Sequence, residues 1–136
     1  QYFPDADIAI LSAAVSDYKP QTIACQKIKK KSDHITIELV PTPDILASLG
    51  KIKTKQFLVG FALETCDELE NAKGKLQRKN LDMIVLNSLN DKGAGFGTPT
   101  NKITLIDKAL NVLPFELKSK AEVAHDIFQF ILQKTS

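Results

Sequence analysis

Three short apolar runs constrain the fold of this chain more than any other feature. They lie at Ile8 to Val15, Phe57 to Ala62 and Met83 to Leu86. Apolar runs of this kind are typical of strands that are covered on both faces, as the strands of parallel sheets are. The sequence therefore predicts three buried strands. The first is expected to be a central strand that ends at a polar loop, Ser16 to Pro20.

Two helices are predicted between these strands. Thr42 can cap the first helix, Pro43 suits its first turn, and Gly50 is suited to its end. The second helix is expected to follow Thr65 and Glu68, which have the spacing of a capping box. Its apolar positions recur at helical spacing, and they are Leu69, Ala72 and Leu76.

A third helix is predicted near the end of the sequence. Ser119 and Glu122 form a second pair with capping-box spacing. The apolar stripe that follows them indicates a helix with one buried face. This stripe consists of Ala124, Ile127, Phe128 and Ile131.

The remaining strand patterns complete the fold prediction. Ile35 to Val40 alternates apolar and polar residues, as a half-exposed strand does, while Ile103 to Ile106 and Val112 to Phe115 flank a turn as a β-hairpin. Buried strands that alternate with amphipathic helices indicate an α/β fold. We expect a Rossmann-like, three-layer arrangement with a mainly parallel sheet plus the hairpin. Ligands of such sheets bind beyond the carboxyl ends of the strands.

Composition narrows the functional classes. The net charge of +2 is too small to predict binding to nucleic acid or to an anionic membrane, and no apolar stretch approaches the roughly 20 residues of a membrane helix. Cys25 and Cys66 lack the pattern of a metal site or a disulfide scaffold, which favours a cytoplasmic protein. His34 and His125 also lack metal-ligand spacing.

Lysines cluster at two places that could receive phosphate. Four lie between Lys27 and Lys31, ten residues after Asp17, whose carboxylate could hold a ribose hydroxyl or a magnesium ion. Lys75 and Lys79 are one helical turn apart and could together bind a di- or triphosphate. Solvated surface lysines explain both patterns equally well and are common.

Two backbone features are further candidates. The helix start from Pro43 to Leu46 offers free N–H groups to phosphate oxygens, although every helix has such an end. The segment from Gly93 to Gly97 contains three glycines and has a length that suits a lid. A flexible turn is the alternative interpretation of that segment.

Taken in order, these segments closely resemble bacterial phosphopantothenoylcysteine synthetases. The resemblance extends from about Asp7 to the end of the chain, and several motifs in one order are more specific than any single motif. The motifs are Ala13-Ala14-Val15-Ser16-Asp17-Tyr18, Lys27-Ile28-Lys29-Lys30, Pro43-Asp44-Ile45-Leu46, Val59-Gly60-Phe61-Ala62-Leu63-Glu64-Thr65, Lys79-Asn80-Leu81-Asp82, and Asn87 through Asn101.

The resemblance implies a two-step ligation of 4'-phosphopantothenate to L-cysteine in coenzyme A biosynthesis. CTP would activate the phosphopantothenate carboxylate as an acyl-cytidylate with release of pyrophosphate, and the cysteine amine would then displace CMP. The resemblance further implies Mg²⁺ and a homodimer. FMN is implied only if a decarboxylase domain is attached upstream.

The resemblance also assigns site residues. Lys27 and Asp17 are the implied catalytic residues, and Asp17 is also the implied metal ligand. The implied lid over the substrate consists of Lys29, Lys30, Gly93, Gly95, Phe96 and Gly97. The implied nucleotide-binding residues are Leu11, Ser12, Ala13, Asp17, Lys27, Pro43, Asp44, Ile45, Leu46, Phe61, Lys75 and Lys79.

Residues 1–136 are expected to be the C-terminal part of a single synthetase domain. The glycine-rich strand–turn–helix at the start of that domain has no counterpart, because no glycine precedes Gly50. Two alternatives to the CTP-dependent ligase therefore stay open. One is a non-catalytic fragment that binds nucleotide or dimerises, with Ile35 to Val40 paired to a partner, and the other is a relative that uses ATP.

Overall fold

The computed structural model describes residues 2–29, 33–88, 90, 94 and 97–135. Its main sheet has five strands in the order β1-β4-β5-β7-β8. The strands β1, β4 and β5 are parallel, whereas β7 and β8 are antiparallel neighbours at one side. Their bounds are β1 Ile8–Leu11, β4 Phe57–Glu64, β5 Met83–Ser88, β7 Ile103–Asp107 and β8 Val112–Pro114.

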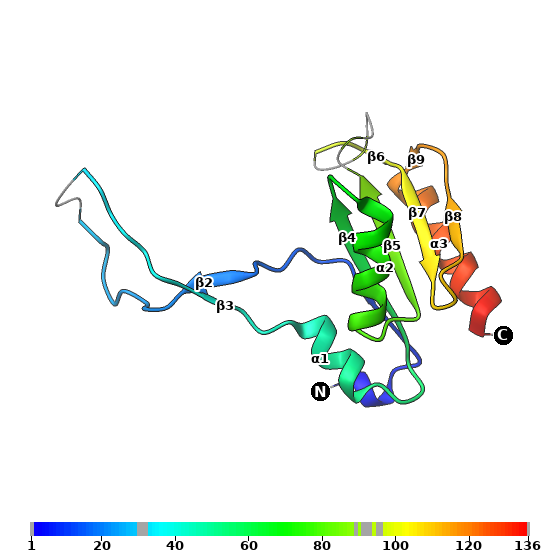
Figure 1. The fold of residues 1–136 in the computed structure, drawn as a ribbon, viewed down its shortest axis with the longest axis horizontal. Helices are drawn as coiled ribbons and strands as arrows, with labels where there is room; N and C mark the ends of the chain where they lie inside the picture. The colour runs from blue at the N-terminus through cyan, green and yellow to red at the C-terminus, as the bar shows by residue number, and fades with distance from the viewer. Residues whose placement is uncertain (1, 30–32, 89, 91–93, 95–96, 136) are drawn as a thin grey trace.

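Helices cover both faces of this sheet, as Figure 1 shows. The helices are η1 Phe3–Asp5, α1 Ile45–Ile52, α2 Glu68–Arg78 and α3 Lys120–Thr135. One core cluster joins Ala72 and Leu76 of α2 to one face of the sheet. A second cluster joins Ile127 and Ile131 of α3 to the other face. The Rossmann-like α/β prediction, with a mainly parallel sheet and a hairpin, is confirmed.

The buried-strand predictions are confirmed for β4 and β5, whereas the first run forms a strand only over Ile8–Leu11 and is only partly buried there. There, β1 ends at Leu11, because its pairing with β4 ends where Leu11 lies opposite Gly60. The next residues, through Pro20, are exposed. In the sheet of the described residues, β1 lies at one end of the strand order.

Between β1 and α1, the chain forms an arm that projects from the body (Figure 1). Its two sides pair where β2 (Tyr18–Pro20) runs antiparallel to β3 (Leu39–Pro41). The strand predicted from Ile35 to Val40 is therefore mostly wrong, since only Leu39 and Val40 belong to β3. Several large apolar side chains of the arm are exposed, namely Val15, Tyr18, Ile23, Ile28, Ile35, Ile37 and Leu39.

The predicted ends of α1 are wrong at both sides. Asp44, not Thr42, is the N-cap, and its Oδ1 accepts a hydrogen bond from the Ala47 N–H over 2.9 Å. This backbone bond, assisted by Lys79, lowers the pKa of the Asp44 carboxyl although partial burial acts in the opposite direction. Gly50 does not end the helix, which continues to Ile52.

The two predicted capping boxes have different outcomes. Thr65 and Glu68 form none, since Asp67 is the N-cap of α2 in a left-handed conformation without a side-chain cap. Ser119 and Glu122 do form one: the Ser119 N–H donates to Glu122 Oε2 over 3.0 Å, and the Glu122 N–H donates to Ser119 Oγ over 3.3 Å. Two short strands, β6 (Thr100–Asn101) and β9 (Lys118–Ser119), pair just before α3.

The predicted buried stripes are partly correct. Ile127 and Ile131 of α3 are buried with Val123, whereas Ala124 and Phe128 are exposed. In α2, Ala72 and Leu76 are buried while Leu69 is exposed. The β7–β8 hairpin forms as predicted, with Leu105 paired to Leu113. No helix within the described ranges is long and apolar enough to cross a membrane.

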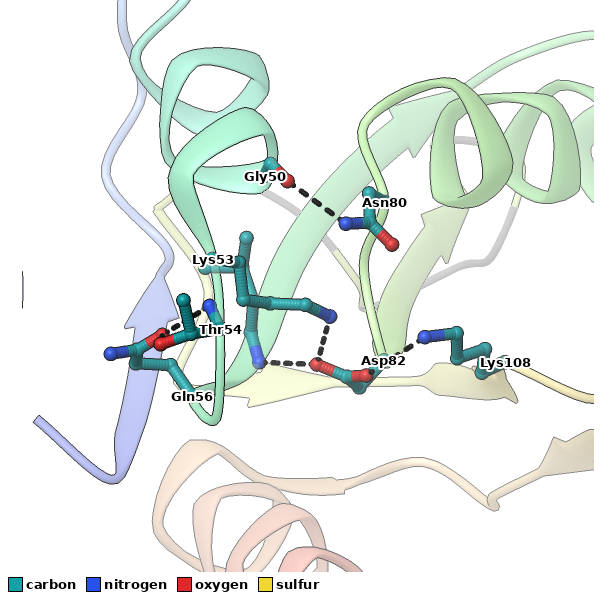
Figure 2. Close-up of polar contacts among 8 residues, drawn as sticks. Gly50, Lys53, Thr54, Gln56, Asn80, Asp82 and Lys108 are labelled. Carbon is teal, nitrogen blue, oxygen red and sulfur yellow. Dashed lines mark hydrogen bonds and ion pairs between the residues drawn. The ribbon is translucent and has the colours of Figure 1, made fainter. Parts of the chain in front are cut away.

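A charged network joins the C-terminal end of α1 to the sheet (Figure 2). Asp82 Oδ2 accepts hydrogen bonds from Lys53 Nζ over 2.7 Å and from the Leu58 N–H over 2.8 Å. The Lys53 side chain is only 6% exposed, so this carboxylate compensates a nearly buried ammonium. Lys108 Nζ lies 3.7 Å from Asp82 Oδ1.

We expect Asp82→Asn to weaken this network more than Lys53→Met does. The amide leaves the buried Lys53 ammonium without its counter-charge, which costs about 2 kcal/mol. Lys53→Met removes that ammonium and leaves Asp82 bonded to Leu58, so its cost is expected to be below about 1.5 kcal/mol. Hydrogen exchange at the Leu58 amide and thermal unfolding measure the difference, and equal effects of the two changes would contradict the assignment.

Candidate functional site

A cavity lies beyond the carboxyl ends of β1 and β4, where a Rossmann-like sheet is expected to bind its ligand. Its volume is about 540 Å³, which is within the range of small-molecule sites. It is lined by Ile10, Leu11, Ser12, Ala13, Ala14, Val15, Asp17, Thr42, Pro43, Asp44, Ile45, Leu46, Phe61, Lys75 and Lys79.

This lining brings together residues that four separate sequence segments contribute. All the residues expected to bind nucleotide are present except Lys27. They come from the end of β1, the start of α1, β4, and the C-terminal end of α2. Their assembly in one cavity is a structural finding, whereas their contact with nucleotide stays a prediction.

The floor of the cavity is fixed where the loop after β1 meets the start of α1. The Thr42 N–H donates to the Asp17 carbonyl over 2.9 Å. The Thr42 hydroxyl donates to the Ser16 carbonyl, and the Ser16 hydroxyl donates to the Tyr18 carbonyl over 2.8 Å. These bonds hold the Asp17 backbone beside the N-terminus of α1, so both face the same space.

Each lysine of the cavity is paired with a carboxylate. Lys79 Nζ lies 2.9 Å from Asp44 Oδ2. Lys75 Nζ lies 2.6 Å from Oε1 of Glu64, the last residue of β4. The cavity therefore holds two ammonium groups at defined positions, and the Asp44–Lys79 pair connects the start of α1 with the end of α2.

A second contact joins α1 to the residues that follow α2. Asn80 Nδ2 donates to the Gly50 carbonyl over 2.9 Å, as Figure 2 shows. Asn80 has a φ of 52°, a left-handed conformation that asparagine tolerates. A Cβ atom on Gly50 would lie 1.9 Å from the Lys79 carbonyl oxygen. Glycine at this position therefore allows the two backbones to meet.

Some predicted site residues do not line this cavity. Lys27 and Lys29 are exposed on the arm, and Gly97, with a φ of 76°, is exposed beyond β5. Lys30, Gly93, Gly95 and Phe96 lie outside the described residues. The catalytic role of Lys27 and the lid role of the other residues therefore stay predictions.

Hydrogen bonds join Ser88 and Asn90, at the end of β5, to the start of α2. Glu68 Oε1 accepts a hydrogen bond from Ser88 Oγ over 2.5 Å and one from Asn90 Nδ2 over 2.9 Å. Asn90 Nδ2 also donates to the Thr65 carbonyl over 3.0 Å. Glu68, which was expected to form a capping box with Thr65, thus binds Ser88 and Asn90 instead.

Sequence reasoning missed two features of the site. It assigned no role to Glu64, and it assigned Thr42 only a capping role. The signal for Glu64 was its place at the carboxyl end of a buried strand. For a metal, the described part of the chain has no group of three or more His, Cys, Asp or Glu side chains, so Asp17 as a metal ligand stays a prediction.

Comparison with known proteins gives the family. Residues 1–135 match the domain family described as the DNA/pantothenate metabolism flavoprotein C-terminal domain. The chain belongs to this family. The predicted relation to the coenzyme A biosynthesis protein is thereby confirmed at the level of the family.

Relatives of this family carry two different names. A protein named cysteine/cysteine sulfinic acid decarboxylase, from an unknown prokaryotic organism, is 62% identical over 131 residues, which are 96% of this chain and 36% of that protein. The coenzyme A biosynthesis bifunctional protein CoaBC of Bacillus subtilis (strain 168) is 44% identical over 126 residues, 93% of this chain and 31% of that protein. The chain thus spans about a third of these relatives.

Solved structures of the family have the same fold. The crystal structure of the C-terminal domain of a CoaBC protein superposes with a TM-score of 0.76 at 38% identity and covers 98% of this chain and 59% of its own. A Cab2 mutant solved in complex with phosphopantothenate-cysteine has a TM-score of 0.60 at 19% identity, over 95% of this chain and 46% of its own, a likeness in fold.

Proposed function

We propose that this chain is the C-terminal part of a single ligase domain that joins 4'-phosphopantothenate to L-cysteine in coenzyme A biosynthesis, with CTP as co-substrate. The observation that carries the proposal is the cavity, where the end of β1, the N-terminus of α1 and two lysines converge. The CoaBC relatives at 44% and 38% identity support the assignment to this pathway.

The cavity suits a nucleotide in three ways. The N-terminus of α1 offers backbone N–H groups to phosphate oxygens. Lys75 and Lys79 can share the charge of a triphosphate between them. The backbone groups of Leu11 to Ala13 and the ring of Phe61 leave room for a base beyond the strand ends.

The charges of the cavity favour a nucleotide that arrives with a cation. Two aspartates and two lysines line it, so its formal charges cancel and cannot neutralise a triphosphate. Both oxygens of Asp44 are already bonded, one to Ala47 and one to Lys79, whereas Asp17 is exposed. Mg²⁺ is commonly held by one or two carboxylates together with substrate phosphates, which Asp17 fits. Such an ion would supply charge neutralisation.

The proposed reaction has two steps. A carboxylate oxygen of 4'-phosphopantothenate attacks the α-phosphorus of CTP, which forms the acyl-cytidylate and releases pyrophosphate. The cysteine amine then attacks the acyl carbon, which forms the amide, while the cytidylate oxygen leaves as CMP. The lysines and the α1 N-terminus would stabilise the negative charge that moves onto the pyrophosphate.

The arm suits two roles in the same proposal. Lys27 and Lys29 are exposed on it and could reach over the cavity as a lid, which would protect the acyl-cytidylate from water. Its exposed apolar side chains suit a second copy of the chain, as a homodimer requires. FMN belongs to the proposal only if a decarboxylase domain precedes this segment.

The name of the 62% identical relative raises a second function, decarboxylation of cysteine or cysteine sulfinate. The matched segment is 36% of that protein. Decarboxylation requires an electron sink, commonly a cofactor. The arrangement of the described cavity favours phosphate binding instead, with lysines and a helix N-terminus. A nucleotide-binding or dimerising fragment and an ATP-using relative are further outcomes of the test.

Pyrophosphate release by the natural full-length protein tests the proposal. We expect release with 4'-phosphopantothenate and CTP, little with ATP, and an amide product only when L-cysteine is added. Release with ATP in preference to CTP would indicate the ATP-using relative. If neither nucleotide yields pyrophosphate, the ligase assignment is wrong, and a carbon dioxide assay with cysteine then tests the decarboxylase.

A further inference from the structure

One carboxylate lies directly behind the cavity and has no part in the function proposed above. Glu64 ends β4 and does not line the cavity, whereas its partner Lys75 does. The Glu64 side chain is 13% exposed and the Lys75 side chain 37%, with Oε1 and Nζ 2.6 Å apart. Glu64 therefore contacts the cavity only through this lysine.

The environment of Glu64 makes the two groups depend on each other. Among the described residues, Glu64 Oε1 is buried and has no partner in a directed hydrogen bond, so the Lys75 ammonium is its compensating charge through the ion pair. A buried carboxylate oxygen without such compensation is costly. The ammonium is thereby kept at the cavity wall, although a half-exposed lysine could otherwise turn towards solvent.

Another ion pair on the same helix has a different setting. Lys73 Nζ lies 3.1 Å from Glu70 Oε1, and the Glu70 side chain is 78% exposed. Exposed pairs of this kind hold their side chains weakly. The Lys73–Glu70 pair is also absent from the cavity lining. It therefore serves as a matched control for the Lys75–Glu64 pair.

We propose that Glu64 is a positioning residue that holds Lys75 ready for the phosphates of the nucleotide. An ammonium has three N–H donors, so Lys75 can remain in its ion pair with Glu64 and still donate to a phosphate in the cavity. A lysine that is already ordered loses less side-chain freedom when the phosphate binds. This inference rests on the proposed nucleotide binding and adds Glu64 to its determinants.

The test compares Glu64→Gln with Glu70→Gln in the natural full-length protein. Calorimetry measures the dissociation constants of CTP and of pyrophosphate, each with Mg²⁺. We expect Glu64→Gln to raise both dissociation constants about 5-fold. It should also raise KM for CTP with kcat nearly unchanged, because Lys75 contacts the phosphates equally in the ground state and in the transition state. Glu70→Gln should change neither. Glu64→Asp keeps the charge on a shorter side chain. Its loss of CTP and pyrophosphate affinity should lie between those of wild type and Glu64→Gln.

A double-mutant cycle separates positioning from a structural role. In a Lys75→Met background, Glu64→Gln should weaken CTP binding no further, because its effect passes through Lys75. The inference is overturned if Glu64→Gln leaves binding unchanged, tightens it, or weakens it equally without Lys75. Wild-type protein that binds neither CTP nor pyrophosphate would overturn the proposed function together with this inference.

Discussion

Gly50→Ala is expected to separate α1 from the C-terminal end of α2 and to widen the cavity. The added Cβ would lie 1.9 Å from the Lys79 carbonyl oxygen and 2.9 Å from the Lys79 carbonyl carbon. These are backbone atoms, so no side-chain rotation relieves the overlap. We expect the free energy of unfolding to fall by about 3 kcal/mol. This loss is larger than the stabilisation that alanine gives over glycine within a helix.

Gly50→Ala should weaken nucleotide binding as well as lower the stability of the fold. The start of α1 and Lys79 both line the cavity, and the Gly50–Asn80 and Asp44–Lys79 contacts join α1 to the end of α2. Once α1 moves, helix N–H groups and Lys79 no longer meet the same phosphates. We expect CTP affinity to fall at least about 10-fold, which corresponds to about 1.4 kcal/mol.

A second glycine provides the control for this prediction. A Cβ on Gly74, within α2, would meet only the end of the flexible Arg78 side chain at 2.7 Å. Gly74→Ala should therefore be neutral or stabilise α2 by about 0.5–1 kcal/mol. Hydrogen exchange in α1 and calorimetry with CTP measure both variants. Equal protection and affinity in Gly50→Ala and wild type would show that the close approach is not required.

Local sequence patterns predicted the elements whose environment is uniform along their length. The apolar runs of β4 and β5 are buried on both faces, so burial and hydrophobicity coincide. The family resemblance supplied the set of residues that line the cavity, and the rule that ligands bind beyond strand ends indicated only the edge of the sheet where they would meet. The prediction of one strand from Ile8 to Val15 was wrong after Leu11, because β1 ends there and the chain then leaves the sheet.

Long-range contacts decided what local patterns could not. Thr42 has the chemistry of an N-cap, but its hydroxyl bonds to Ser16 and Asp44 takes the cap instead. Glu68 has the spacing of a capping box, but its carboxylate bonds to Ser88 and Asn90. In both cases a partner more than 15 residues away in sequence competes with the local backbone.

The same limit applies to the site. The ion pairs of Lys75 and Lys79 join residues from different elements, and neither pairing follows from sequence spacing. Gly50 was expected to end a helix, yet its function is a close approach between two backbones. The sequence could therefore indicate which residues line the cavity, but not which contacts hold α1 against the end of α2.

Lys27→Gln is expected to reduce pyrophosphate release at least about 100-fold and to leave the fold intact. Lys27 is exposed on the arm and outside the cavity, so the body of the protein does not depend on it. If the arm closes over the bound substrates, the Lys27 ammonium adds positive charge to a cavity in which the charges of the lining residues cancel. The amide retains size and polarity but removes that charge.

Lys19→Gln is the matched control, because Lys19 is also exposed on the arm, within β2. Pyrophosphate release and thermal unfolding are measured for both variants in the full-length protein. A loss confined to Lys27→Gln supports a specific role in forming the acyl-cytidylate. Equal losses would indicate that only the total charge of the arm matters, and normal release from Lys27→Gln would remove Lys27 from the catalytic residues.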